Sequence, residues 1–389
     1  MEIRPIESGD ARDQFVQWMD YCFKDETGWT QRMFPLPSED RAVGLFDGDR
    51  LTAALLSKGF TSRIFGETVP SNGIACVVTA PQYRNQRHIR KLLSQTLHEE
   101  YERGAMFSAL YPFQFGFYQK FGYGSLGPTV GYMLDPHAIR TPELPPGQMV
   151  PFNASARQLD ELFEVYNHWV LNFDFGILRP KPTVEKFVQS LSFDKENVFL
   201  YYDENEVCQG FIQFYFNTQR EYVVRLKVTS MAWNNAPAFQ ALLHFLWTHR
   251  DQCKDIKWTP PPALPLSWLT REPRIEQYTA FSWMARPLNV PELVRLKAEK
   301  LAETGRTTFS ITDDVIPSNS GTYTIQGAEV IKEPFRERNV LPFHLFSSLL
   351  FGGISLDQAQ LAGLVTASLD DMDGSFFAFN RNIYLSEKF

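Results

Sequence analysis

Residues 74–90 read IACVVTAPQYRNQRHIR, and this stretch decides the fold. Its apolar first part is typical of a buried strand, which Pro81 ends. Apolar residues then recur at helical spacing from Ile89 to Tyr101 and predict an amphipathic helix. A strand that turns into a helix leaves unpaired backbone N–H groups and the positive end of the helix dipole beside the turn. Three arginines and a histidine lie in residues 81–90, so this turn is a candidate phosphate site; a plain connection with solvated basic residues is the alternative.

Predicted strands lie on both sides of this unit. Alternating residues from Val43 to Ser57, interrupted by Asp47-Gly48-Asp49, predict a hairpin, and a second hairpin is expected around Phe65-Gly66-Glu67. The run from Ala105 to Leu110 predicts another buried strand. The order of elements is therefore strand, turn, helix, strand.

The same order returns roughly 155 residues later, which predicts two related domains. A hairpin is expected over residues 198–216, a strand over Leu226 to Met231, and a helical stripe from Phe239 to Leu246. At the turn, the second copy has Trp233-Asn234-Asn235-Ala236-Pro237 in place of the basic loop, so no cofactor is assigned to it.

The C-terminal part of the chain has a different sequence pattern. From about residue 287 onward, a hairpin over residues 309–325 and an apolar helix near Pro342 to Phe351 predict a smaller α+β module.

Bulk properties restrict the class of protein. With 389 residues, a prior of roughly 100–200 residues per domain predicts two to three domains. The net charge of -7 argues against nucleic acid, and no apolar run reaches membrane-spanning length. The four cysteines stand singly and no H-x-x-H pair occurs, so we expect reduced thiols, no metal site and a cytoplasmic protein without a signal peptide.

Residues 77–84, 108–113 and 117–124 together resemble the Eis-type (enhanced intracellular survival) branch of the GNAT N-acetyltransferases, and the similarity spans nearly the whole chain. The resemblance implies a mixed α/β, α+β fold with tandem GNAT domains followed by a sterol-carrier-protein-like (SCP2-like) domain. The implied domains are an acetyltransferase domain over 1–145, a degenerate GNAT-like domain over 146–286 and the sterol-carrier-like domain over 287–389.

The same resemblance implies acetyl-CoA as co-substrate, held by the first domain. The implied contacts are Val77, Val78, Thr79, Arg84, Asn85, Gln86, Arg87, His88, Ile89, Arg90, Phe113 and Gln114. One position departs from the family, because Arg87 stands where the family loop has glycine. Glycine there lets phosphate approach the backbone, so the Arg87 side chain is expected to point away or to bind phosphate itself.

By resemblance, Tyr118 is the catalytic acid and the main-chain carboxylate of Phe389 is the base, while Tyr123 is assigned to packing. A tyrosine near pKa ~10 suits a thiolate whose conjugate acid lies near ~8.5. A carboxyl near ~3.5 is a weak base for an ammonium near ~10.4, a mismatch that desolvation would reduce. Asp25 and Glu26 match a stretch that lines the family's substrate pocket, with a solvated loop as the alternative. Trp29 is a candidate for an apolar wall of that pocket, with burial as the alternative.

The expected activity is transfer of an acetyl group to a primary amine, such as a polyamine, an aminoglycoside or a lysine side chain, in a ternary complex. The alternative is a non-catalytic protein that binds a small ligand or lipid in the sterol-carrier-like domain. The resemblance also implies a homo-oligomer, with hexamers common in the family.

Overall fold

The computed structural model describes residues 1–24, 30, 36, 40–140, 144–220, 223–262, 264–301, 305–365, 372–380 and 382–387. Contacts divide the chain into two compact units. The first holds residues 1–127, 282–380 and 387–389, and the second holds 128–281 and 381–386. Two long strands, β6 (Gly124–Leu134) and β12 (Glu276–Pro287), carry the chain from one unit to the other.

The sheet of the first unit is antiparallel except for one parallel pair, β4–β5. Its order is β1 (Glu2–Pro5), β2 (Arg41–Asp47), β3 (Arg50–Ile64), β4 (Glu67–Thr79), β5 (Phe107–Leu110) and the end of β12. The β4–β5 pair is parallel, because a helix connects the two strands. Between β3 and β4, Phe65 and Gly66 both have positive φ, the geometry of a tight two-residue hairpin turn.

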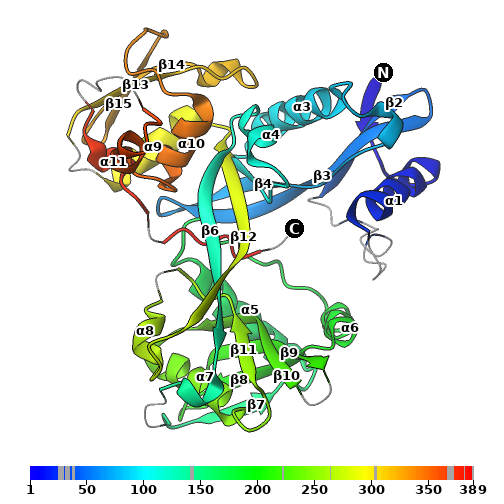
Figure 1. Cartoon of the computed structure of the whole chain (residues 1–389), viewed down its shortest axis with the longest axis vertical. Coiled ribbons are helices and arrows are strands. Elements are labelled where there is room, and N and C mark those ends of the chain that lie inside the picture. Colours follow the sequence, from blue (N-terminus) through cyan, green and yellow to red (C-terminus); the bar gives the residue numbers. More distant parts are fainter. Residues whose placement is uncertain are drawn as a thin grey trace. The chain divides into compact units, whose positions relative to one another are not determined.

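Helices cover both faces of this sheet (Figure 1). On one face, α3 (His88–Glu102) buries its apolar stripe against β2, β3 and β4, and the short α4 (Phe115–Gln119) joins the same core. On the other face, α1 (Asp10–Phe23) buries Phe15 and Met19. The predicted amphipathic helix and both predicted hairpins of this unit are confirmed.

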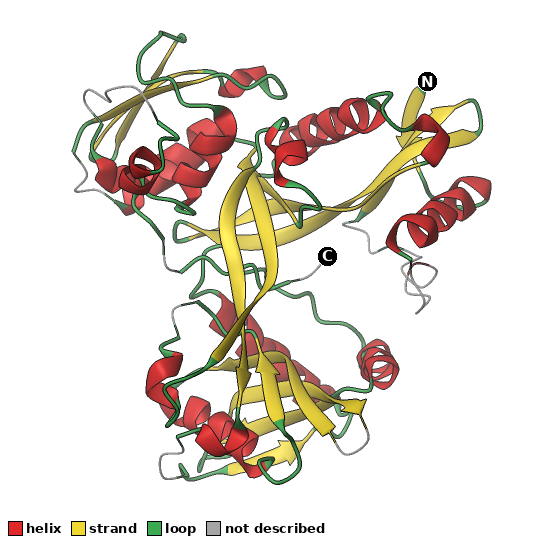
Figure 2. Ribbon diagram, viewed as in Figure 1, coloured by secondary structure: helices red, strands yellow, loops and turns green. Residues whose placement is uncertain are grey.

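The second unit repeats this pattern of elements (Figure 2). Its strand order is β6, β11 (Asp255–Trp258), β10 (Val223–Trp233), β9 (Cys208–Arg220), β8 (Asn197–Tyr202) and β7 (Gln148–Pro151), and β10–β11 is the parallel pair. The helices are α5 (Ala156–Val170), α6 (Val184–Asp194), α7 (Ala236–Thr248) and α8 (Leu266–Leu269). As predicted, a hairpin, a long strand and a helix recur in the same order.

The C-terminal segment forms a three-stranded antiparallel sheet of β13 (Thr307–Ile311), β14 (Gly321–Gln326) and β15 (Glu329–Glu333). The predicted hairpin and apolar helix are confirmed, the helix as α10 (Phe343–Phe351). Two further helices, α9 (Val290–Lys300) and α11 (Leu356–Leu361), belong to this segment. Its core is aromatic: the Phe309 ring contacts Tyr323, Phe346 and Phe377.

Among the helices that the structure describes, none is long and apolar enough to cross a membrane. The expected domain boundaries at 145/146 and 286/287 stay predictions.

Candidate active site

The strands β4 and β5 separate where the candidate site begins. They pair at Asn72–Ser108, Gly73–Ala109 and Ile74–Leu110, after which β5 ends while β4 continues to Thr79. Cys76 has a left-handed φ of 51°, and the β3–β4 register shifts at this point, so a β-bulge bends the unpaired part of β4. Because β5 ends, those backbone groups of residues 75–79 that do not pair with β3 have no strand partner on the β5 side, where an extended ligand could pair with them.

A basic loop follows the open strand. After a short 3-10 turn over Pro81–Tyr83, both Asn85 (φ 64°) and Arg87 (φ 63°) adopt the left-handed conformation. Arg87 is the N-cap of α3, and no side chain caps this helix. At the equivalent helix of the second unit, α7, the Asn235 side chain accepts a hydrogen bond from the Ala238 N–H at 2.9 Å. The first turn of α3 therefore lacks the cap that α7 has and presents donors suited to an anion.

These elements enclose a cleft of about 750 Å³. Its lining is Cys22, Val77, Thr79, Tyr83, Arg84, Asn85, Arg87, His88, Ile89, Arg90, Phe113, Phe117, Lys120 and Phe121.

The charge of this cleft is one-sided. Three arginines and Lys120 line it, and the described lining contains neither Asp nor Glu. None of Arg84, Arg87 and Arg90 forms an ion pair with a carboxylate that the structure describes, although the Arg84 guanidinium lies 5.8 Å from the Tyr21 ring centre. Unpaired cations beside an uncapped helix start favour a polyanion such as a pyrophosphate.

The opposite wall of the cleft is aromatic. Phe113 is 71% exposed, an unusual state for phenylalanine, and its ring packs on Phe117 at 5.1 Å between centroids. An apolar ligand segment in the cleft would cover this ring and remove it from water.

Most of the residues predicted for the cofactor lie together in this cleft: Val77, Thr79, Arg84, Asn85, Arg87, His88, Ile89, Arg90 and Phe113. Three do not line it. Val78 points to the other face of the sheet and is buried against the α1 core. Gln86 is exposed and donates to the Gln82 carbonyl at 3.2 Å, and the exposed Gln114 precedes α4 as its N-cap.

Five lining residues were not predicted: Cys22, Tyr83, Phe117, Lys120 and Phe121. Phe117, Lys120 and Phe121 stand in the stretch that carried the family resemblance, so their proximity to Tyr118 was a usable signal. Cys22 lies on α1, and nothing local in the sequence indicates that its side chain reaches the cleft.

Tyr118 lies behind the aromatic wall rather than in the lining. It is only 3% exposed, and its ring contacts Phe113, Phe117 and Tyr123 at centroid distances of 5.5, 5.0 and 6.0 Å. Burial raises the pKa of the Tyr118 hydroxyl above its ordinary value. No described residue forms a hydrogen bond with this hydroxyl. The phenol is thus neutral and has a free donor.

Tyr123, the nearest competitor, is already occupied. Its hydroxyl hydrogen-bonds the Ser108 hydroxyl at 2.7 Å, and Ser108 donates to Asn72 at 3.0 Å. Asn72 donates to Ser57 at 2.8 Å, which donates in turn to Glu100 at 2.8 Å. This buried polar chain satisfies the Tyr123 hydroxyl and holds its ring beside Tyr118.

Four predicted site residues, Asp25, Glu26, Trp29 and Phe389, lie outside the described residues. The tail that leads to Phe389 is described as far as Glu387, whose carbonyl accepts a 2.5 Å hydrogen bond from the Tyr111 hydroxyl. Tyr111 directly follows β5, so the chain just before the tail is tied to the end of that strand.

Within the part of the chain that the structure describes, no group of three His, Cys, Asp or Glu side chains could hold a metal ion.

Three protein-family models match parts of the chain. Residues 2–126 and residues 177–296 each match an acetyltransferase (GNAT) domain, and residues 292–382 match a sterol carrier protein domain. No curated protein matches the chain significantly in sequence.

Solved structures with the same fold cover nearly the full length. Eis1 from Mycobacterium abscessus has a TM-score of 0.80 at 16% identity, with 100% of each chain covered. A GCN5-related N-acetyltransferase from Anabaena variabilis has a TM-score of 0.79 at 20% identity, covering 98% of this chain and 100% of that one. A probable N-acyltransferase from Enterococcus faecalis has a TM-score of 0.76 at 17% identity, covering 95% and 94%.

The GNAT fold binds acyl-CoA, and the cleft between β4, β5 and α3 has the polar and apolar parts that such a molecule requires. Two GNAT domains in tandem, followed by a sterol carrier protein domain, reproduce the Eis-type arrangement over the whole chain. The chain is therefore an N-acetyltransferase of the GNAT superfamily with the Eis-type architecture.

Proposed function

We propose that this chain transfers the acetyl group of acetyl-CoA to a primary amine of a small molecule by direct attack in a ternary complex. The observation that carries the proposal is the cationic cleft in the first GNAT domain, where an open strand edge meets an uncapped helix start. The cleft lies in a GNAT domain and not in the sterol-carrier-like segment, which favours a transferase over a lipid-binding protein.

The two ends of the cleft suit the two ends of acetyl-CoA. The pyrophosphate would bind at the first turn of α3, where Arg87 and Arg90 supply charge and the backbone supplies N–H groups. The pantetheine arm would lie along the open edge of β4 at Val77 and Thr79. In that orientation the thioester would lie toward the aromatic wall, behind which Tyr118 is buried.

The reaction needs one bond formed and one broken. The amine nitrogen attacks the thioester carbonyl carbon, the C–N bond forms, and the C–S bond breaks to release CoA thiolate. Strand N–H groups would stabilise the oxyanion. The amine loses its proton to a base, and the departing sulfur receives a hydrogen bond and then a proton.

Tyr118 is the proposed acid. Because burial raises its pKa, proton transfer to a thiolate whose conjugate acid is near ~8.5 is less favourable than for an exposed tyrosine. Its main contribution is therefore a hydrogen bond to the sulfur as negative charge develops, and full transfer follows late.

The proposed base and the proposed amine-binding residues are assigned from the resemblance to the Eis-type family. We keep the Phe389 carboxylate as the proposed base, supported by the Tyr111–Glu387 hydrogen bond that ties the tail to the end of β5. Asp25, Glu26 and Trp29 stay proposed contacts for a polyamine, an aminoglycoside or a lysine-type amine. A homo-oligomer is a further proposal, which sedimentation of the full chain would test.

The activity is tested by release of CoA thiol from acetyl-CoA in a panel of diamines, aminoglycosides and lysine peptides. Tyr118→Phe should lower kcat by roughly 100-fold with an unchanged Kd for acetyl-CoA. Tyr123→Phe is the matched control: it removes an equally buried hydroxyl, and kcat should stay within about threefold. Full kcat in Tyr118→Phe, or loss of kcat only in Tyr123→Phe, would contradict the assignment. A short extension after Phe389 should likewise reduce kcat if its carboxylate is the base.

A further inference from the structure

The turn that follows α4 is held by the C-terminal half of the chain. The Phe121 carbonyl accepts a 2.6 Å hydrogen bond from Nη1 of Arg286, and the next carbonyl, Gly122, accepts one of 2.7 Å from the Ser347 hydroxyl. Both carbonyls lie in the turn beyond α4 and its C-cap, Lys120. Two side chains, one from β12 and one from α10, thus supply hydrogen-bond donors to the backbone of this turn.

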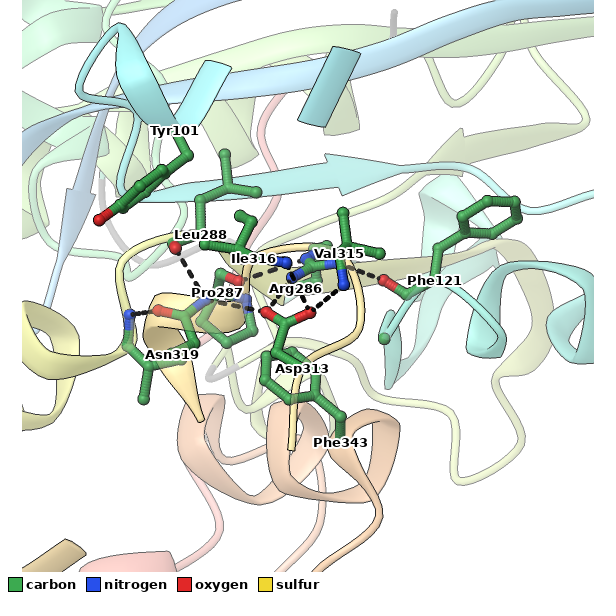
Figure 3. Close-up of polar contacts among 12 residues, drawn as sticks. Tyr101, Phe121, Arg286, Pro287, Leu288, Asp313, Val315, Ile316, Asn319 and Phe343 are labelled. Atoms are coloured by element: carbon green, nitrogen blue, oxygen red, sulfur yellow. Dashed lines mark hydrogen bonds and ion pairs between the residues drawn. The ribbon is translucent and has the colours of Figure 1, made fainter. Parts of the chain in front are cut away.

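Arg286 is itself fixed by a buried carboxylate. Its Nη2 lies 2.6 Å from Oδ2 of Asp313, with side-chain exposures of 0% and 2% (Figure 3). Asp313 also accepts from the backbone N–H groups of Val315 and Ile316, and from the Asn319 amide at 2.9 Å. The ion pair is shielded from water, and the buried carboxylate and guanidinium both have hydrogen-bond partners. These contacts hold the guanidinium in one position.

Glycines let α10 approach this turn closely. A Cβ on Gly122, where φ is 82°, would lie 2.5 Å from the Phe343 ring. A Cβ on Gly124 would lie 2.4 Å from the Ser348 backbone nitrogen and 2.5 Å from the His344 oxygen. The backbone of α10 therefore packs directly on Gly124, and the Phe343 ring packs on Gly122.

The held turn is continuous with Tyr118. The N–H groups of Phe121 and Tyr123 both donate to the Tyr118 carbonyl, at 2.9 and 3.3 Å. The Phe121 side chain lines the cleft and packs on Phe117 at 5.6 Å. A shift of the turn would move the backbone of Tyr118 and the aromatic wall together.

We propose that Arg286, Asp313 and Ser347 are positioning residues for acetyl transfer, through which the sterol-carrier-like segment fixes the turn that carries Tyr118. The inference rests on the proposed function, because it acts through the proposed acid. It gives the third segment a part in the reaction that does not require a bound lipid.

Ser347→Ala is the most informative single variant, because it removes the hydroxyl that donates to the turn and keeps the Cβ. The hydroxyl shares its proton with the Phe343 carbonyl inside α10, at 3.0 Å against 2.7 Å to Gly122, and the α10 backbone does not depend on that contact. Ser310→Ala is its matched control: Ser310 is also 0% exposed, lies in the same segment, and hydrogen-bonds Thr322 at 2.8 Å without touching the α4 turn. Arg286→Met and Asp313→Asn each break the buried ion pair and are at risk of unfolding the segment. The comparison of Ser347→Ala with Ser310→Ala therefore decides whether the positioning role holds.

The first readout is hydrogen exchange of the amides of residues 119–124, which needs no activity. Exchange should be about tenfold faster in Ser347→Ala than in Ser310→Ala, because only the former loosens the turn. The second readout is kinetic. Ser347→Ala should lower kcat by about tenfold with KM for acetyl-CoA changed less than about twofold, whereas Ser310→Ala should change neither.

A double-mutant cycle with Tyr118→Phe shows whether the effect runs through the acid. In that background Ser347→Ala should have no further effect on kcat, because the group that it positions is gone. The inference is overturned if exchange and kcat of Ser347→Ala equal those of Ser310→Ala, or if the loss in kcat persists in the double variant. Full kcat in Tyr118→Phe alone would instead refute the acid of the proposed function, so the two failures are distinguishable.

Discussion

Two substitutions of Arg87 distinguish the effect of its side-chain charge on acetyl-CoA binding from the effect of its backbone conformation. Its side chain brings positive charge to the cleft, and its backbone adopts the left-handed conformation that ends the loop and starts α3. Arg87→Ala removes the charge and keeps a side chain on a left-handed backbone. Arg87→Gly removes the charge and the Cβ together.

The expected magnitudes follow from the geometry. A residue other than glycine in the left-handed conformation costs roughly 1 kcal/mol, but glycine loses roughly 0.4–1 kcal/mol through the larger entropy of its unfolded chain. The free energy of unfolding of Arg87→Gly should therefore lie within about 0.5 kcal/mol of the parent. A charge-assisted contact from an exposed arginine to a phosphate is worth about 1.4 kcal/mol, so both variants should bind acetyl-CoA about tenfold more weakly.

Titration calorimetry with acetyl-CoA at low and high salt provides the assay. The tenfold deficit should shrink as salt rises, because screening weakens the pair in the parent chain. Arg103→Ala is the matched control, since Arg103 is exposed at the opposite end of α3 and should bind normally. Parent-like affinity of both Arg87 variants at low salt would refute a phosphate contact. Weak binding by Arg87→Ala alone would show that backbone geometry, not charge, is what matters.

Further predictions concern the cleft, the acid and the glycine contact. Acetyl-CoA should protect Cys22 from alkylation in mass-spectrometric mapping, while Cys76 stays unreactive near pH 8 because burial raises the pKa of its thiol to about 12. The pH profile of kcat should show no alkaline decline from Tyr118 below about pH 10, since a raised pKa keeps the phenol protonated to higher pH; a decline near pH 8 would contradict this. Gly124→Ala should lower the free energy of unfolding by more than about 2 kcal/mol in denaturant titration, whereas Gly116→Ala, with open space for its Cβ, should be neutral or stabilising.

The sequence predicted the features that depend on near neighbours in the chain. Gly66 marks a hairpin turn, the spacing of apolar residues after Ile89 marks a helix, and both are confirmed because each signal is local. The bulge at Cys76 was not predicted, since a cysteine gives no sign that its φ is positive. The contact of Arg286 with the Phe121 carbonyl was also missed, because 165 residues separate them and neither lies in a recognisable pattern.

Arg87 shows a different limit of sequence reasoning. A missing glycine was expected either to turn its side chain away or to place it on the phosphate. The structure shows that Arg87 adopts the left-handed backbone geometry for which glycine is favoured. The side chain lines the cleft, which is the geometry required for the second possibility.

The two helix starts explain why a cofactor site is proposed for only one of the two related domains. In α7, Asn235 caps the first turn, a contact worth about 1 kcal/mol to local stability. In α3, Arg87 provides no side-chain cap and itself adopts a left-handed backbone that costs roughly another 1 kcal/mol. The start of α3 is thus about 2 kcal/mol less stable locally than the start of α7, which has its own side-chain cap. An anion bound to the free N–H groups of α3 would restore the missing contacts, so acetyl-CoA should stabilise the start of α3 more than any other part of the chain.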